Sequence, residues 1–336
     1  MVKSEWTRRR LLRAGAMTCV AASLSPATSW AKGKDVAYIT PFGKIVAYAP
    51  DFIASAGGYF DSAGVNVEII GGNGSAQAIQ LVAAGKALVG RTGGIDVVKA
   101  IATSNVPVRA IATISHTSPF LVVSSPDKPI NNPKDMAGKT IGIVSRGGGT
   151  DNYLDIMLTS AGLAKDSVTR QVAGNSPGAF DLLELGRLDA FIADETVVIM
   201  LRRAGKSPVA WPVDNYASIP GQVYVASDDG IKDHREELIG FLRGVRQAIN
   251  FITAPGQMDM VLEKLKTFNL DELRTPDIAK ASIEAQAKLW LAAGPENLLR
   301  NMPDKWAHGW SEMAAAGLVK EGDPRLAYTN DLVAAL

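Results

Sequence analysis

The stretch "IVSRGGGTDNYL", residues 143–154, shows how this chain is built. An apolar run ends, three glycines follow at 147–149, and a helix-like segment begins at Thr150, a candidate N-cap residue. The lysine of the Walker phosphate-binding pattern is missing, and the glycines lack the G-x-G-x-x-G spacing of dinucleotide-binding loops. What remains is a strand, a glycine loop and a helix N-terminus, whose free N–H groups favour an anion or a polar oxygen.

The same strand–glycine–helix arrangement occurs twice more, in "EIIGGNGSAQAIQ" (68–80) and "LVGRTGGIDVV" (88–98). Three such turns suit a ligand clamped between two lobes, although glycines also serve simply to permit tight turns after a strand. The residues of these turns that we take as candidates for ligand binding are Asn73, Gly74, Ser75, Arg91, Thr92, Gly93, Arg146, Gly148, Gly149 and Thr150.

Short apolar runs rich in β-branched residues alternate with amphipathic segments through the first two thirds of the chain. Strands are predicted at 35–40, 65–70, 87–90, 108–114, 120–125, 140–145, 168–173, 188–194 and 221–227. Helices are predicted near 75–85, 94–104, 150–161, 177–185 and 195–204. This alternation predicts an α/β fold with parallel sheets that are covered on both faces.

The last third of the chain is mostly helical. Helices are predicted at 234–252 and near 255–267, 275–293 and 303–316, with no strands of their own to cover. The simplest assembly has two α/β lobes, with residues 32–116 and 219–336 in lobe one and residues 117–218 in lobe two. The chain would cross between the lobes at "SHTSPF" (115–120) and "PGQVYV" (220–225), and the ligand would lie in the cleft at the carboxyl ends of the strands.

The N-terminus has the plan of an export signal. "TRRRLLRAGAMTCVAASLSPATSWAKG" (7–33) has a basic start, an apolar middle and a small-x-small end at Ser29–Ala31. Arg8 and Arg9 resemble the pair of a bacterial twin-arginine signal, although general secretion remains an alternative. We therefore expect residues 1–31 to be cleaved and the mature protein to reside in the periplasm.

Composition excludes several classes of function. Removal of residues 1–31 leaves 30 basic and 33 acidic residues, so the mature chain is mildly acidic and a nucleic-acid partner is not expected. The only cysteine, Cys19, lies within the export signal, and the three histidines match no metal-binding spacing. We expect neither a metal nor another cofactor.

An ordered set of segments resembles periplasmic solute-binding proteins of ABC importers, in the branch that binds sulfonates, nitrate, taurine and the pyrimidine precursor of thiamine. The segments that carry the resemblance are "GGYFDSAGVNVEII" (57–70), "AIQLVAAGKALVG" (78–90), "PVRAIATIS" (107–115), "INNPKDMAGKTIGI" (130–143), "LLELGRLDAFIAD" (182–194) and "IPGQVYVASDDGIKDHREELIGFLRG" (219–244). Arg91 and the turn "SRGGGTDN" (145–152) depart from the usual family pattern, which leaves the ligand open.

The resemblance also implies which residues face the cleft. In the three glycine turns, these residues also include Gly94 and Gly147. The others are Thr40, Pro41 and Phe42 after the first strand, His116 and Thr117 at the first crossover, and Asn175, Ser176, Asp194 and Glu195 after later strands.

The charged candidates can be interpreted in more than one way. Arg91 and Arg146 would hold an anion from opposite lobes, unless both are solvated loop residues. Asp194 and Glu195 would receive an amine or hydroxyl groups, or would cap the next helix. His116 is more often a hinge or core residue than a ligand contact.

The sequence thus predicts a binding protein without catalytic residues, a monomer that delivers a small solute to a permease and an ATPase. A sulfonate or taurine-like anion is the first expectation. The second is a thiamine-type pyrimidine, a flavin-type vitamin or an aromatic carboxylate, with stacking on Phe42 and on Tyr38, unless Tyr38 is a core residue. The same pattern is also compatible with a biosynthetic enzyme on this fold or with a sensory module that binds its ligand in the same way.

Overall fold

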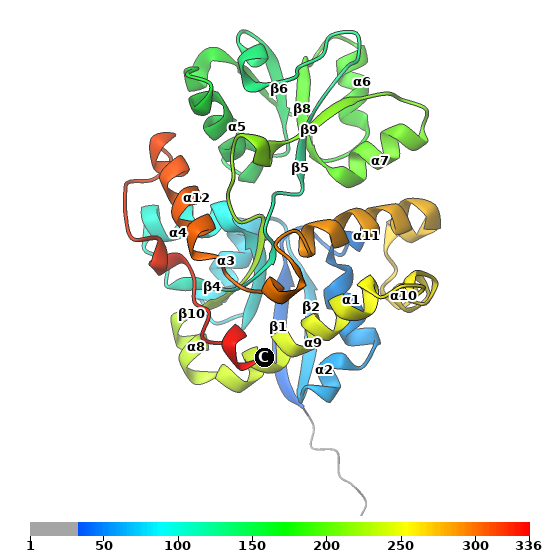
Figure 1. The fold of residues 1–336 in the computed structure, drawn as a ribbon, viewed down its shortest axis with the longest axis vertical. Coiled ribbons are helices and arrows are strands. Elements are labelled where there is room, and N and C mark those ends of the chain that lie inside the picture. The colour runs from blue at the N-terminus through cyan, green and yellow to red at the C-terminus, as the bar shows by residue number, and fades with distance from the viewer. Residues whose placement is uncertain (1–32) are drawn as a thin grey trace, which may run out of the picture. The chain divides into compact units, whose positions relative to one another are not determined.

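The computed structural model describes residues 33–336, so the predicted export signal lies outside the described residues. This part of the chain forms two five-stranded sheets with helices on their faces, which confirms the predicted α/β fold (Figure 1). The first sheet has the strand order β2-β1-β3-β10-β4 and the second has the order β7-β6-β8-β5-β9. The strands are β1 (Lys34–Thr40), β2 (Val65–Gly71), β3 (Val89–Gly93), β4 (Val108–Ser115), β5 (Phe120–Ser124), β6 (Thr140–Ile143), β7 (Thr169–Val172), β8 (Ala190–Asp194), β9 (Val209–Pro212) and β10 (Gln222–Ser227).

The expectation of parallel sheets is wrong for one strand in each sheet. β10 is antiparallel to β3 and β4, and β5 is antiparallel to β8 and β9. These are the two strands that directly follow the crossovers between the sheets. A chain that leaves one sheet at its carboxyl edge and enters the facing carboxyl edge of the other must run against the remaining strands. The edge strand β9 was not predicted from the sequence.

The helices agree closely with the sequence periodicity. They are α1 (Ala49–Ala56), α2 (Tyr59–Ser62), α3 (Ser75–Ala83), α4 (Gly94–Ser104), α5 (Gly149–Ser160), α6 (Gly178–Glu184), α7 (Glu195–Arg203), α8 (Asp228–Asp233), α9 (Arg235–Thr253), α10 (Met258–Leu265), α11 (Pro276–Trp290) and α12 (Pro303–Ala315). The structure adds α1 and α2, which pack against α9 beside the first sheet and were not predicted. No helix among residues 33–336 has both the length and the apolar character needed to cross a membrane.

The two crossovers between the sheets lie against each other, and their close contact requires a glycine at position 221. A Cβ atom on Gly221 would lie 1.9 Å from the carbonyl oxygen of Thr117, so no side chain fits at this point. The N–H of Gly221 donates to the carbonyl of Ser115 (2.9 Å), and the N–H of Ser118 donates to Asp214 (3.2 Å). These contacts hold both connections together, next to the edge where the two sheets face each other.

Helices from the C-terminal third contact elements of both sheets. α12 contacts α4 beside the first sheet and α5 beside the second. α11 contacts the short 3-10 turn Val46–Tyr48 as well as α7 (Figure 1). A third connection is made by Lys99 of α4, whose Nζ donates to Oδ1 of Asn152 in α5 at 3.0 Å. Two of the four predicted helices without strands of their own, α11 and α12, therefore bridge the two sheets.

Candidate functional site

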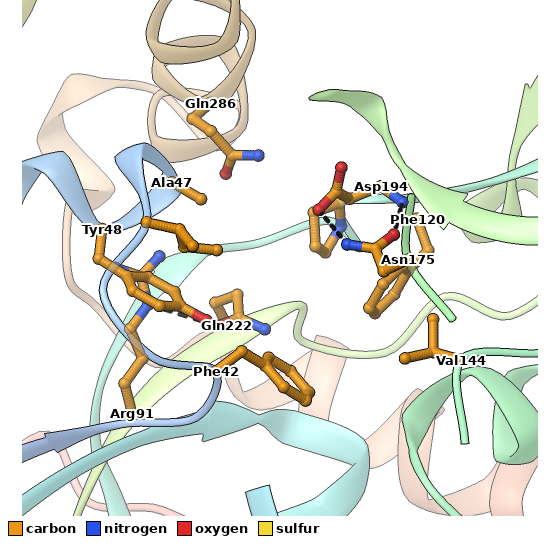
Figure 2. A pocket seen from close by; sticks show the side chains of 12 residues that line it. Phe42, Ala47, Tyr48, Arg91, Phe120, Val144, Asn175, Asp194, Gln222 and Gln286 are labelled. Atoms are coloured by element: carbon orange, nitrogen blue, oxygen red, sulfur yellow. Dashed lines mark hydrogen bonds between the residues drawn. The ribbon is translucent and has the colours of Figure 1, made fainter. Parts of the chain in front are cut away.

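A cavity of about 260 Å³ lies where the carboxyl ends of the two sheets face each other (Figure 2). Its walls come from both sheets and from α11, and most of the lining is apolar. The lining residues are Phe42, Ile45, Ala47, Tyr48, Arg91, Pro119, Phe120, Val144, Asn175, Asp194, Gln222 and Gln286. Four of the predicted site residues, Phe42, Arg91, Asn175 and Asp194, belong to this set.

Phe42 presents its ring to the cavity from the loop after β1. The loop is fixed by Thr40, whose hydroxyl donates to the carbonyls of Gly43 and Ile70. Gly43 in turn donates its N–H to the carbonyl of Gly72 at 2.8 Å. Phe42 remains 44% exposed, although it is a large apolar side chain. An exposed ring on a fixed loop at a cavity wall is a platform on which a planar ligand can stack.

Arg91 lines the cavity, and its positive charge is neutralised by the buried carboxylate of Asp51. Its side chain is 1% exposed, and Nη1 donates to Oδ2 of Asp51 at 3.2 Å. The hydroxyls of Tyr38 and Tyr224 also donate to the Asp51 carboxylate, the first at 2.7 Å. Burial raises the pKa of Asp51 above its ordinary value, while Arg91 and the two tyrosine hydroxyls oppose the rise. Tyr38 is thus a core residue and offers no stacking surface to a ligand.

Two contacts connect this buried network to the cavity. The Arg91 guanidinium lies 4.7 Å from the centre of the Tyr48 ring, a cation–π arrangement that holds the ring against the site. Arg91 Nε donates to Oε1 of Gln222 at 3.3 Å, so the Gln222 amide contacts Arg91 through its oxygen and not through its NH₂ group. The network therefore fixes one aromatic and one amide side chain in the cavity wall.

Asp194 and Asn175 form a polar pair on the opposite wall (Figure 2). Asn175 Nδ2 donates to Oδ2 of Asp194 at 2.7 Å, and the backbone N–H of Asp194 donates back to Oδ1 of Asn175 at 3.0 Å. Oδ1 of Asp194 caps α7 by accepting from the N–H of Val197 at 3.2 Å. Burial raises the pKa of Asp194 above its ordinary value, with Asn175 and the helix N–H groups opposing the rise. Asp194 thus caps a helix, as one of the two interpretations expects, and it also lines the cavity.

The glycine turns border a second, smaller cavity of about 30 Å³ that shares Phe42, Phe120, Val144 and Gln222 with the first. The predicted residues Ser75, Gly93, Gly149 and Thr150 line it. Thr150 is not the N-cap of α5, because that position is held by Gly148 and Thr150 lies in the first turn of the helix, where its hydroxyl accepts from the N–H of Val144 at 3.0 Å.

Other predicted residues lie outside both linings. Asn73 is exposed, and its N–H is capped by Gln77. Thr92 is buried with an unpartnered hydroxyl, and Thr40 serves the loop described above. The ring of His116 is within 3.3 Å of the Asn297 carbonyl, and burial lowers its pKa, as suits a residue at the crossover. Gly74, Gly148 and Glu195 are also absent from the linings of both cavities.

The expected clamp of two arginines does not form. Arg146 is exposed and donates through Nη2 to the backbone carbonyl of Arg170 at 2.7 Å, away from the cavity. Arg170 pairs with Asp151 at 2.9 Å. Since Arg91 is paired with Asp51, no cation that residues 33–336 contribute to the lining of the 260 Å³ cavity is free to hold an anion.

Sequence reasoning missed several of the lining residues. Tyr48 lies on a short turn, Val46–Tyr48, that was not predicted and that leads into the equally unpredicted α1. Gln286 lies on a helix whose burial depends on a contact distant in sequence. Phe120 carried a usable signal, because it ends the predicted crossover segment at 115–120. Among residues 33–336, no group of three or more His, Cys, Asp or Glu side chains is placed to hold a metal ion.

Structural comparison places the molecule among proteins of one fold. A protein of Bordetella bronchiseptica RB50 has 22% identity and a TM-score of 0.71, covering 90% of this chain and 97% of its own. The nitrate-binding protein NrtA of Synechocystis PCC 6803 has 11% identity and a TM-score of 0.68, covering 90% and 88%. The alkanesulfonate-binding protein SsuA of Xanthomonas axonopodis pv. citri, bound to MOPS, has 13% identity and a TM-score of 0.64, covering 91% and 98%.

At these identities the likeness establishes the fold alone, which is that of the periplasmic binding proteins. No curated protein matches the sequence. The family described as "NMT1/THI5 like" matches residues 45–258, which is more than half of the chain. The protein therefore belongs to the NMT1/THI5-like family.

Proposed function

We propose that this protein is the extracytoplasmic solute-binding component of an ABC importer and that it captures a small, planar, nitrogen-containing ring compound. Residues 32–116 with 219–336 and residues 117–218 would act as two lobes that close on the solute, without catalytic turnover. The cavity supports this proposal, because its walls come from both sheets at the edge where open α/β sheets bind ligands. The predicted export signal, the periplasmic location and the permease and ATPase partners are parts of the same proposal.

The observation that carries the ligand class is the combination of aromatic rings with a lone carboxylate. Phe42, Tyr48 and Phe120 line the cavity, while Arg91, the only cation among the described residues of the lining, is paired. Asp194 offers carboxylate oxygens, which already accept hydrogen bonds from Asn175 and Val197, and acceptors of this kind favour an N–H donor over an anion. The volume of about 260 Å³ lies just below the roughly 300–1,000 Å³ that drug-sized ligands require, so a solute of one or two rings fits best.

A sulfonate or taurine-like anion is the second candidate. It is favoured by the N-terminus of α5, where Gly149 and Thr150 border the smaller cavity and the helix dipole attracts negative charge. That cavity, at about 30 Å³, has room for little more than a water molecule in the present arrangement. The anion therefore has weaker support than the ring compound.

Native mass spectrometry and thermal-shift measurements would test the proposal. The full-length protein is expressed in an exporting bacterial host, purified without denaturant, and screened with 4-amino-5-hydroxymethyl-2-methylpyrimidine, cytosine, riboflavin, benzoate, taurine and ethanesulfonate. A ligand present at 100 times its Kd stabilises the folded state by about 2.7 kcal/mol, which raises Tm by several degrees. Stabilisation by an amino-substituted ring supports the proposal. Stabilisation by taurine or ethanesulfonate alone contradicts the ligand class, and turnover of a bound compound contradicts the binding role.

Acidification is expected to weaken binding of an amino-substituted ring through Asp194. The ionised carboxylate accepts from the ligand, so binding favours the deprotonated form. Because burial raises the pKa of Asp194, protonation begins at a higher pH than for an ordinary aspartate, and affinity should fall as the pH drops through that raised pKa. Titration calorimetry over a series of decreasing pH values, starting from neutral pH, checks this. Asp194→Asn should bind more weakly at neutral pH and lose this part of the pH dependence; an unchanged profile in the variant would refute the role of Asp194.

A further inference from the structure

Gln286 is a polar residue on the buried face of α11. Ala279, Ile283, Gln286 and Trp290 recur at intervals of three and four residues, and each is at most 3% exposed. Helical periodicity places all four on one stripe, and the other three belong to the apolar core beside the first sheet. An apolar residue would therefore be the ordinary occupant of position 286.

The Gln286 amide has no partner among the residues around it. Its side chain points from α11 into the cavity, and none of the other lining residues hydrogen-bonds to it (Figure 2). Neither amide atom is among the fully enclosed polar atoms that lack a partner, so the amide opens onto the cavity. A ligand that displaces water there has to pair with the amide, because an unpaired buried polar group costs free energy. The cavity is the space in which the missing partner would lie.

The helix that carries Gln286, α11, contacts elements on two sides of the cavity. The helix contacts the turn at Val46–Tyr48, which carries Tyr48, and also contacts α7, which begins beside Asp194. It therefore lies across the cavity between the aromatic wall and the acidic wall. It also lies beyond residues 45–258, the part of the chain that matches the family.

We propose that α11 is a third wall of the binding site and that Gln286 is its specificity-determining residue, which recognises a ring edge with a donor and an acceptor side by side. An amide presents one acceptor and two donors in a plane, so it complements an exocyclic amino group next to a ring nitrogen. Asp194 accepts a hydrogen bond from the same ligand on the opposite wall. This inference rests on the proposed function, since it needs a ring compound in the cavity.

The test compares two probes that differ in one group, 4-amino-2-methylpyrimidine and 2,4-dimethylpyrimidine, by titration calorimetry. The wild-type protein should prefer the amino compound by about tenfold, the effect of one well-placed buried hydrogen bond. Gln286→Leu should weaken binding of the amino compound more than that of the dimethyl compound, which can only accept at a ring nitrogen, and should thereby reduce the preference. Its Tm without ligand should be equal to or higher than that of the wild type, because an apolar residue suits the buried stripe.

Ser282→Ala is the matched control. Ser282 lies one turn earlier on α11, is buried with an unpartnered hydroxyl, and does not line the cavity, so the preference should be unchanged. Equal preference for the amino probe in Gln286→Leu and wild type would overturn the role of Gln286 but leave the binding function standing. An equal loss of affinity for both probes in Gln286→Leu would indicate a structural role and would also overturn it. If the folded wild-type protein binds neither these probes nor the ring compounds screened above, the proposed function itself fails.

Discussion

Replacing Asp51 with alanine is expected to lower the free energy of unfolding by about 3–5 kcal/mol, because it leaves the Arg91 guanidinium buried without its counter-charge. The side chains of the pair are 1% and 0% exposed, so water cannot compensate for the loss. The hydroxyls of Tyr38 and Tyr224 lose their acceptor at the same time. Chemical denaturation monitored by circular dichroism measures the change.

Two further variants separate the buried charge from other effects. Glu184→Ala removes the partner of Lys206 in an exposed ion pair and should change stability by less than about 1 kcal/mol. Asp51→Leu combined with Arg91→Met removes both charges and should recover much of the lost stability. A loss for Asp51→Ala as small as that for Glu184→Ala would mean that the pair does not hold this part of the fold together.

Phe42→Ala is expected to weaken binding of the ring ligand by about tenfold to a hundredfold. Stacking of a heteroaromatic ring on an aromatic side chain contributes about 1–3 kcal/mol, and each 1.4 kcal/mol corresponds to a factor of ten in Kd. Because Phe42 is largely solvent-accessible in the unliganded protein, its truncation should leave the stability of the free protein almost unchanged. Calorimetric titration with the ligand found in the screen, together with Tm of the free variant, measures both quantities.

Leu185→Ala is the control for Phe42→Ala. Leu185 is also a large, exposed apolar residue, at the end of α6, but it lies outside the cavity lining. Its truncation should leave affinity unchanged. Equal affinity of Phe42→Ala and wild type would exclude stacking on this ring, whereas a large drop in Tm of the free variant would show that Phe42 has a structural role.

The candidate site was predictable only in part. Phe42, Asn175 and Asp194 each follow or end a strand, and the rule that ligands bind at carboxyl ends of strands is enough to find them. Arg91 follows the predicted strand 87–90, but in the structure it lies within β3, and its sequence position does not show that Asp51, forty residues earlier, neutralises it. Arg146 also follows a strand, yet its side chain turns to the Arg170 carbonyl. A strand end gives the position of a residue, whereas its charge and direction depend on neighbours distant in sequence.

The sequence by itself determined the α/β class and most of the strands and helices, because the alternation of residues with period 2 or 3.6 is a local property of the chain. It also located the crossovers and the three glycine turns. The tertiary structure decided that β5 and β10 run antiparallel, that Arg91 is a paired core residue, and that α11 places Gln286 over the cavity. Each of these three features depends on contacts between residues that are far apart in the chain, and local sequence patterns carry no information about such long-range contacts.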